Sequence, residues 1–188
     1  MSSPQPKTRT STLADWATWE GRWEIIQGIP YDMTPAPSPE HQRASMALSL
    51  AIGNALLDAR RKHGGACEVM AAPIDLFLPG DPGSVYQPDL VIVCDPTKIT
   101  QRGIEGVPEL VVEILSPSTA GKDVTRKRWA YEAAGVPEYL IVDPSERVGL
   151  LLRLQDGRYE EAARGEWGAV VALLDGKVPV TLEPPPPL

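Results

Sequence analysis

The sequence has few cysteines and no long hydrophobic run. Cys67 and Cys94 are its only cysteines, and both lie in apolar segments typical of strands, which indicates two reduced core thiols, although one disulfide stays possible. No segment approaches the roughly 20 consecutive apolar residues of a membrane-spanning helix. The polar start, MSSPQPKTRTST, lacks the apolar region of a signal peptide. These absences favour a cytoplasmic protein with no membrane partner.

Basic residues are also in deficit, since 18 Lys and Arg face 25 Asp and Glu, a net charge of −7. This balance argues against a generally basic surface for nucleic acid but leaves room for one local groove. Clustered carboxylates also suit a divalent metal ion. The 188 residues predict one domain at 13–182, between a disordered tail at 1–12 and a proline-rich tail at 183–188.

A strand–helix–strand unit at residues 106–144 organises the chain. Residues 110–115 are a short run, apolar on both faces, as in an interior strand. A helix follows from Ser118 or Thr119 to Gly135, and a second apolar strand covers residues 139–142. This order of elements predicts a parallel or mixed sheet.

Glu113 is the anomaly in the first of these strands. Because alternate residues of a strand share a face, Glu113 lies with Val111 and Leu115. Burying even a neutral polar group without a partner costs about 2–7 kcal/mol, so this carboxylate needs a cation, a metal ion or a wet cleft. A structural ion pair is the simpler alternative.

The helix that follows offers Glu113 a partner. Val124, Lys127, Tyr131 and Ala134 recur at steps of three and four, so they form one stripe that is apolar apart from Lys127 and the tip of Tyr131. Lys127 is therefore predicted to point toward the sheet. An exposed pair with Asp123, one turn away, is the alternative.

A long helix is predicted earlier in the chain. Ser38 is a favourable N-cap, Pro39 suits the first helical position, and the helix ends near Gly64. Glu40 and His41 lie in its first turn. A lone histidine is most often structural, but the adjacent acid makes the pair a candidate for the site.

Asp89 is a third candidate acid, near the start of an apolar strand. Pro88 cannot donate to a strand ladder and marks a strand start or a bulge, where side chains are often directed into a site. The alternative is that Asp89 merely follows a turn.

The other expected elements are a short helix at 13–20, a hairpin at 23–33 turning at Gln27-Gly28, one or two strands in 67–78, a strand at 85–94, a polar connection at 95–107, and strand pairs at 148–162 and 170–182 turning near Asp156-Gly157 and Asp175-Gly176.

The acids stand on two successive apolar strands that we expect to pair. Two carboxylates on adjacent strands can bind Mg²⁺, which prefers oxygen ligands. A nearby lysine can position or deprotonate water, or stabilise developing phosphate charge. Asp89, Glu113 and Lys127 therefore predict a metal-dependent hydrolytic site.

Six segments, each weak alone, form a series along the chain: Trp23–Gly28, Pro39–His41, Pro88–Val93, Pro108–Thr119, Asp123 with Lys127 and Tyr131, and Gly135–Tyr139. In this order and spacing they resemble the Uma family of restriction-endonuclease-like proteins, within the PD-(D/E)XK nuclease superfamily. The resemblance covers about residues 23–154. It implies an α+β fold with a restriction-endonuclease-like core: a mixed sheet flanked by two main helices, with an extra N-terminal hairpin and C-terminal strands.

The resemblance also implies a function, namely a homodimeric endonuclease that hydrolyses DNA with Mg²⁺, with Mn²⁺ as a substitute. It assigns the metal-binding aspartate to Asp89 and the second acid to Glu113. The superfamily pattern has a lysine two residues after the second acid, where this chain has Leu115. Lys127 on the next helix is the natural substitute.

Supporting roles fall to four more residues. Glu40 and His41 would close the site as ligands or proton carriers, and Asp123 and Tyr131 would orient Lys127. Two alternatives remain: a nuclease fold that has lost cleavage and serves as a binding or regulatory module, and a structural ionic network in an unrelated enzyme. In the second case Asp89, Glu113 and Lys127 should not converge on one cleft.

Overall fold

The computed structural model describes residues 10–33, 36–81, 83–116 and 123–182. The tails expected at 1–12 and 183–188 lie mostly outside these ranges. Ser11 and Thr12 are an exception, since the Ser11 N–H donates to the Gly28 carbonyl at 2.9 Å and Thr12 caps helix α1 (Leu13–Trp16). Both residues belong to the folded domain, so the N-terminal boundary was expected slightly too late.

A six-stranded mixed sheet forms the centre of the molecule, in the order β11-β10-β9-β8-β5-β3. Its strands are β3 (Glu68–Ala71), β5 (Leu90–Val93), β8 (Leu110–Ile114), β9 (Glu138–Asp143), β10 (Val148–Gln155) and β11 (Arg158–Glu166). Only β8 and β9 pair in parallel, across helix α3 (Asp123–Ala134), while the other neighbours are antiparallel. The predicted strand–helix–strand unit and the expected pairing of the two acid-bearing strands are confirmed.

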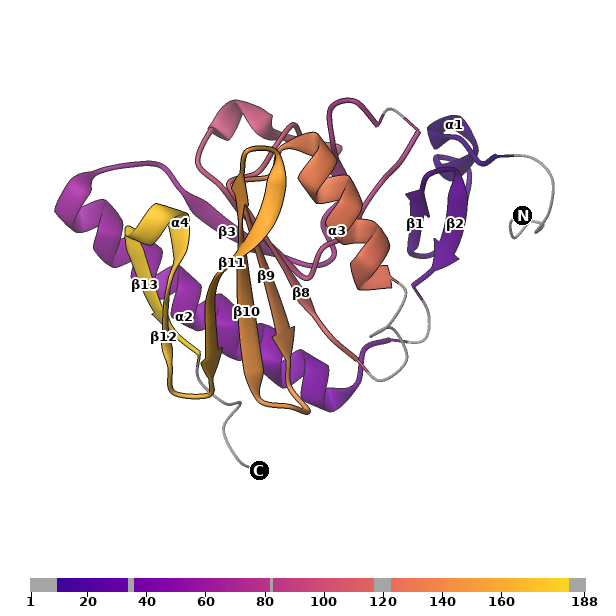
Figure 1. Ribbon diagram of the computed structural model, residues 1–188. Coiled ribbons are helices and arrows are strands. Elements are labelled where there is room, and N and C mark those ends of the chain that lie inside the picture. The colour runs from indigo at the N-terminus through magenta and orange to yellow at the C-terminus, as the bar shows by residue number, and fades with distance from the viewer. Residues whose placement is uncertain (1–9, 34–35, 82, 117–122, 183–188) are drawn as a thin grey trace.

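The two main helices cover opposite faces of this sheet (Figure 1). On one face, Leu110 and Val112 of β8 pack with α2 (Pro39–His63) in the larger core. On the other face, Val111 packs with Tyr131 of α3. Glu113 shares the face of Val111, as the alternation along the strand predicts, and therefore points toward α3.

Helix α2 follows its predicted signals. Ser38 accepts a hydrogen bond from the His41 N–H at 3.2 Å, Pro39 occupies the first turn, and Gly64 follows the last turn with a positive φ of 74°. Its buried side chains recur every three or four residues, which is the spacing of one helical face. They are His41, Ala44, Leu48, Ile52 and Leu56.

Smaller sheets surround the main one. The N-terminal hairpin, β1 (Trp23–Ile26) with β2 (Ile29–Asp32), turns at Gln27-Gly28 as predicted, and β12 (Val170–Ala172) pairs with β13 (Val178–Thr181) around the short turn α4 (Leu173–Gly176). The polar connection expected at 95–107 was wrong in part. It contains the turn η1 (Pro96–Lys98) and two strands, β6 (Ile99–Thr100) and β7 (Gly103–Glu105), which join β4 (Leu76–Phe77) in a three-stranded sheet. Strands this short are too brief to show a period in the sequence.

The two cysteines form a disulfide, so the expectation of two reduced thiols was wrong. Glu68 pairs with Val93 in the antiparallel ladder of β3 and β5, which brings Cys67 opposite Cys94. The sequence showed two apolar segments but not this register. No helix in the part of the chain that the structure describes is long and apolar enough to cross a membrane.

Candidate functional site

Asp89 and Glu113 meet at one end of the β5–β8 pair. The antiparallel register pairs Leu90 with Val112, so one further step places Asp89 directly opposite Glu113. The Asp89 Oδ2 atom accepts a hydrogen bond from the Ile114 N–H at 2.7 Å. The aspartate therefore binds across to the strand that carries the glutamate.

Lys127 points into the sheet from α3 and is only 5% exposed. Its Nζ lies 3.0 Å from Oε1 of Glu113 and 3.2 Å from Oε2. The predicted inward stripe of α3 is thus correct, and the alternative of an exposed lysine is not. The three charged residues therefore lie close together. The alternative of a structural network in an unrelated enzyme predicted that they would not.

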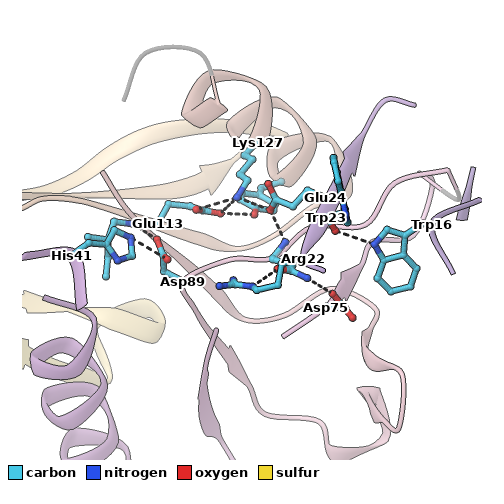
Figure 2. A network of polar contacts seen from close by, with 12 residues as sticks. Trp16, Arg22, Trp23, Glu24, His41, Asp75, Asp89, Glu113 and Lys127 are labelled. Carbon is cyan, nitrogen blue, oxygen red and sulfur yellow. Dashed lines mark hydrogen bonds and ion pairs between the residues drawn. The ribbon is translucent and has the colours of Figure 1, made fainter. Parts of the chain in front are cut away.

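Glu24 is the acid that the sequence reasoning missed. It lies on β1 and is 3% exposed, and its Oε1 is 2.7 Å from the Lys127 Nζ and accepts the Gln87 N–H at 2.6 Å. Figure 2 shows Lys127 between Glu113 and Glu24. The signal was present, because Glu24 lies in the apolar segment Trp23–Ile26 just as Glu113 lies in its own strand.

His41 joins the cluster from the first turn of α2. Its Nε2 is 3.2 Å from Asp89 Oδ1, on the side of Asp89 away from Lys127 (Figure 2). Glu40 does not join the cluster: it is exposed and has no hydrogen bond or ion pair with a described residue. Consecutive helical residues point about 100° apart, so only one of the two can face the sheet. The structure therefore brings His41, but not Glu40, into the cluster.

The expected supports of Lys127 also differ. The Tyr131 hydroxyl donates to Glu113 Oε1 at 2.8 Å, so it orients the acid rather than the lysine. The side chain of Asp123 lies outside the described part of the structure. Glu24 and Glu113 are the groups that hold Lys127.

Burial dominates the electrostatics of the cluster. It raises the pKa of Glu113 to about 8, and the carboxylates of Asp89 and Glu24 add to this rise while Lys127 opposes it. Burial alone would lower the pKa of Lys127, but Glu113 and Glu24 raise it by more, so the ammonium stays charged. Burial lowers the pKa of His41, but the hydrogen bond to Asp89 and the charges of Asp89 and Glu113 together raise it by more. Three acidic side chains, those of Glu24, Asp89 and Glu113, thus share the ammonium of Lys127.

The donor set fits a divalent cation. Carboxylate oxygens are the ligands that Mg²⁺ prefers, and the excess negative charge favours a further cation. Within the described ranges, two buried polar atoms lack a hydrogen-bond partner, His41 Nδ1 and the Tyr139 hydroxyl. Charge from Asp89 and Glu113 reaches Tyr139 and raises its pKa further, after burial itself. Such atoms beside an acidic cluster fit a bound water or a hydrated ion.

A preformed metal cage is not part of this arrangement. In the ranges that the structure describes, no group of three or more His, Cys, Asp or Glu side chains is arranged to hold a metal ion. Lys127 contacts both oxygens of Glu113, and His41 contacts Asp89. A cation entering here would compete with these two side chains for the same oxygens.

The mixed sheet between two helices, with acids meeting at the end of two central strands, is a restriction-endonuclease-like fold. A solved structure described as "a putative nuclease belonging to DUF820 from Anabaena variabilis ATCC 29413" superimposes with a TM-score of 0.69, over 91% of this chain and 94% of that chain. Their sequences are 17% identical, so this likeness supports the fold alone.

The sequence itself identifies the family. The model of the family Uma2, described as "Putative restriction endonuclease", matches residues 11–177. The chain belongs to this family, which confirms the resemblance seen in its motifs. A search of curated proteins finds no match.

Proposed function

We propose that the protein is a Mg²⁺-dependent endonuclease that hydrolyses phosphodiester bonds in DNA. The observation that carries this proposal is the convergence of Asp89, Glu113 and Lys127, from three separate elements, in one buried cluster with excess negative charge. Membership of a family of nucleases supports the reaction class.

Asp89 and Glu113 would hold the metal ion, with Mn²⁺ as a substitute for Mg²⁺. A bound ion of this kind lowers the pKa of a water molecule and polarises a phosphoryl oxygen. Lys127 cannot act as the base, because its raised pKa keeps it protonated. Its role is to donate hydrogen bonds and to stabilise negative charge on the phosphate.

Glu24 and His41 would act as positioning residues. Glu24 is fixed by the Gln87 N–H and holds the second side of the Lys127 ammonium, and His41 holds Asp89. Neither contact requires Glu24 or His41 to touch the substrate.

Plasmid cleavage with Mg²⁺ or Mn²⁺ tests the proposal. Asp89→Asn and Glu113→Gln should each lower the rate by more than about 100-fold, the usual effect of removing one group that stabilises transition-state charge. Glu109→Gln is the matched control, since this partly exposed glutamate pairs with Lys98 and not with a residue of the cluster. Equal activity in the native protein and both site variants would remove the proposal.

A nuclease-fold binding module is the second candidate function. Leu115 occupies the usual lysine position, and Lys127 is already bound by two carboxylates. Calorimetry with Mg²⁺ and a nucleic-acid binding assay separate the two functions. Tight metal binding that Asp89→Asn abolishes counts against the binding module, whereas DNA binding without metal binding or cleavage supports it.

We also propose that the protein acts as a homodimer, as its resemblance to the PD-(D/E)XK superfamily implies, because two copies would offer one site to each strand of a duplex. Sedimentation equilibrium measures the mass directly. A monomer at working concentrations, with or without DNA, would refute this part of the proposal.

A further inference from the structure

A groove of about 560 Å³ lies at the far end of α2 from the acidic cluster. It is bordered by the last turn of α2, the Gly64-Gly65 connection, and the start of β13 beside α4, which Figure 1 shows next to one another. At 1.5 Å per residue, His63 is about 33 Å along the helix from His41. The groove is therefore separate from the proposed active site.

The groove combines an apolar floor with a cationic rim. Leu56, Ala59, Leu174 and Val178 line the floor, and Arg60, His63 and Lys177 line the rim. Its volume and mainly apolar lining are typical of sites for small molecules.

The rim has no internal counter-charge. Among the described residues, Arg60, His63 and Lys177 form no ion pair, whereas the neighbouring Arg61 is paired with Asp58 at 3.1 Å. The C-terminus of α2 contributes only about half a negative charge. Arg60 and Lys177 together exceed this, so the groove is positive on a protein whose net charge is −7. An anion would be attracted to it.

One end of the disulfide also lines the groove. Cys67 is among the lining residues, and Cys94 is not. An incoming thiolate attacks the disulfide sulfur that it can reach, and the groove gives access to Cys67. Neighbouring cations also favour the thiolate form of such a thiol.

We propose that this groove binds a small anionic thiol, with carboxylates that pair with Arg60 and Lys177, and directs it to Cys67. The thiolate sulfur attacks Sγ of Cys67, a new sulfur–sulfur bond forms, and the bond to Cys94 breaks, leaving Cys94 as a thiolate. A second thiolate attacks the mixed disulfide and releases Cys67 as a thiolate, so the small thiol is oxidised and the protein disulfide is reduced. The reverse sequence, with the oxidised small thiol, closes the disulfide.

The first experiment needs no variant. The full-length protein is oxidised with glutathione disulfide, and its reduction is followed with glutathione, an anionic thiol, and with cysteamine, a cationic one. Rates are divided by those for a small reference disulfide. Glutathione should be favoured by about threefold to tenfold at about 0.1 M salt, and this preference should vanish at about 1 M salt, where charges are screened. No preference, or two free thiols that resist oxidation, would overturn the proposal.

The second experiment removes the cations. Replacing both Arg60 and Lys177 by alanine should abolish the preference for glutathione without slowing cysteamine. Arg158→Ala, an exposed arginine on the opposite edge strand, is the matched control and should change neither rate. A double variant that keeps the preference refutes the role of the rim.

Trapping identifies the sulfur that is attacked. In Cys94→Ser, glutathione disulfide should leave a mixed disulfide on Cys67 that mass spectrometry detects. In Cys67→Ser, Cys94 should react several-fold more slowly. Faster reaction at Cys94 would contradict attack from the groove.

Discussion

Replacing Lys127 by methionine removes one charge from the centre of the acidic cluster while keeping most of the side-chain volume. The Lys127 side chain is 6% exposed and lies 2.7 Å from Glu24 and 3.0 Å from Glu113, whose side chains are 4% and 10% exposed. Breaking a buried ion pair by removing one partner typically costs 3–5 kcal/mol, because the other charge stays buried without compensation. Since two carboxylates lose their partner here, we expect a loss of about 4 kcal/mol near pH 10, where Glu113 is ionised in the native protein.

Chemical denaturation of both proteins measures this loss. Lys98→Met is the matched control, because Lys98 forms a pair of similar length with Glu109, at 3.0 Å, with side chains 23% and 29% exposed. Water screens that pair, so its removal should cost only about 1 kcal/mol.

The pH dependence tests the cause of the loss. The uncompensated carboxylates destabilise the variant, and protons neutralise them. Because the pKa of Glu113 is about 8 with Lys127 present and higher without it, the difference between Lys127→Met and the native protein should shrink as pH falls from about 10 to about 8. A loss of less than about 1 kcal/mol, or one that is the same at both pH values, would refute the view that Lys127 neutralises the cluster.

Three further predictions concern the same cluster. Because protons compete with a metal ion for Glu113, whose pKa is raised to about 8, Mg²⁺ affinity should rise with pH up to about 8 in calorimetric titrations, and a flat profile would contradict metal binding through this acid. Tyr131→Phe removes a hydrogen bond that lowers the pKa of Glu113, so the same titration curve should shift to higher pH at a stability cost of about 1 kcal/mol. Glu24→Gln should reduce plasmid cleavage by about tenfold, since Lys127 loses half of its support, while Glu40→Gln should leave it unchanged. The opposite ranking of these two variants would show that Glu40 of α2, not Glu24 of β1, serves the site.

The sequence predicted the parts of the fold that depend on local signals. The N-cap at Ser38 and the inward position of Lys127 follow from capping and helical periodicity, and both are present in the structure. The choice between Glu40 and His41 required knowing which side of the helix faces the sheet, and local patterns did not resolve it.

Long-range register set the remaining features. Glu24 reaches Lys127 only because the N-terminal hairpin docks beside Gln87, and Cys67 meets Cys94 only through the pairing of β3 with β5. Neither relation is encoded within a single window of sequence. An acid in an apolar strand signals that a partner exists without saying where in the chain it lies.

The position of the N-terminal hairpin determines the charge of the acidic cluster. Glu24 is carried by β1, which bridges to the rest of the protein through the paired Ile25 and Val85. If this hairpin detached, the acidic cluster would lose a covering strand and the carboxylate of Glu24 at the same time. Lys127 would then keep its ion pair with Glu113 but not the one with Glu24. Any partner or cleavage that displaces these few N-terminal residues would therefore adjust the electric field at Asp89 and Glu113 from a distance, without touching either of them.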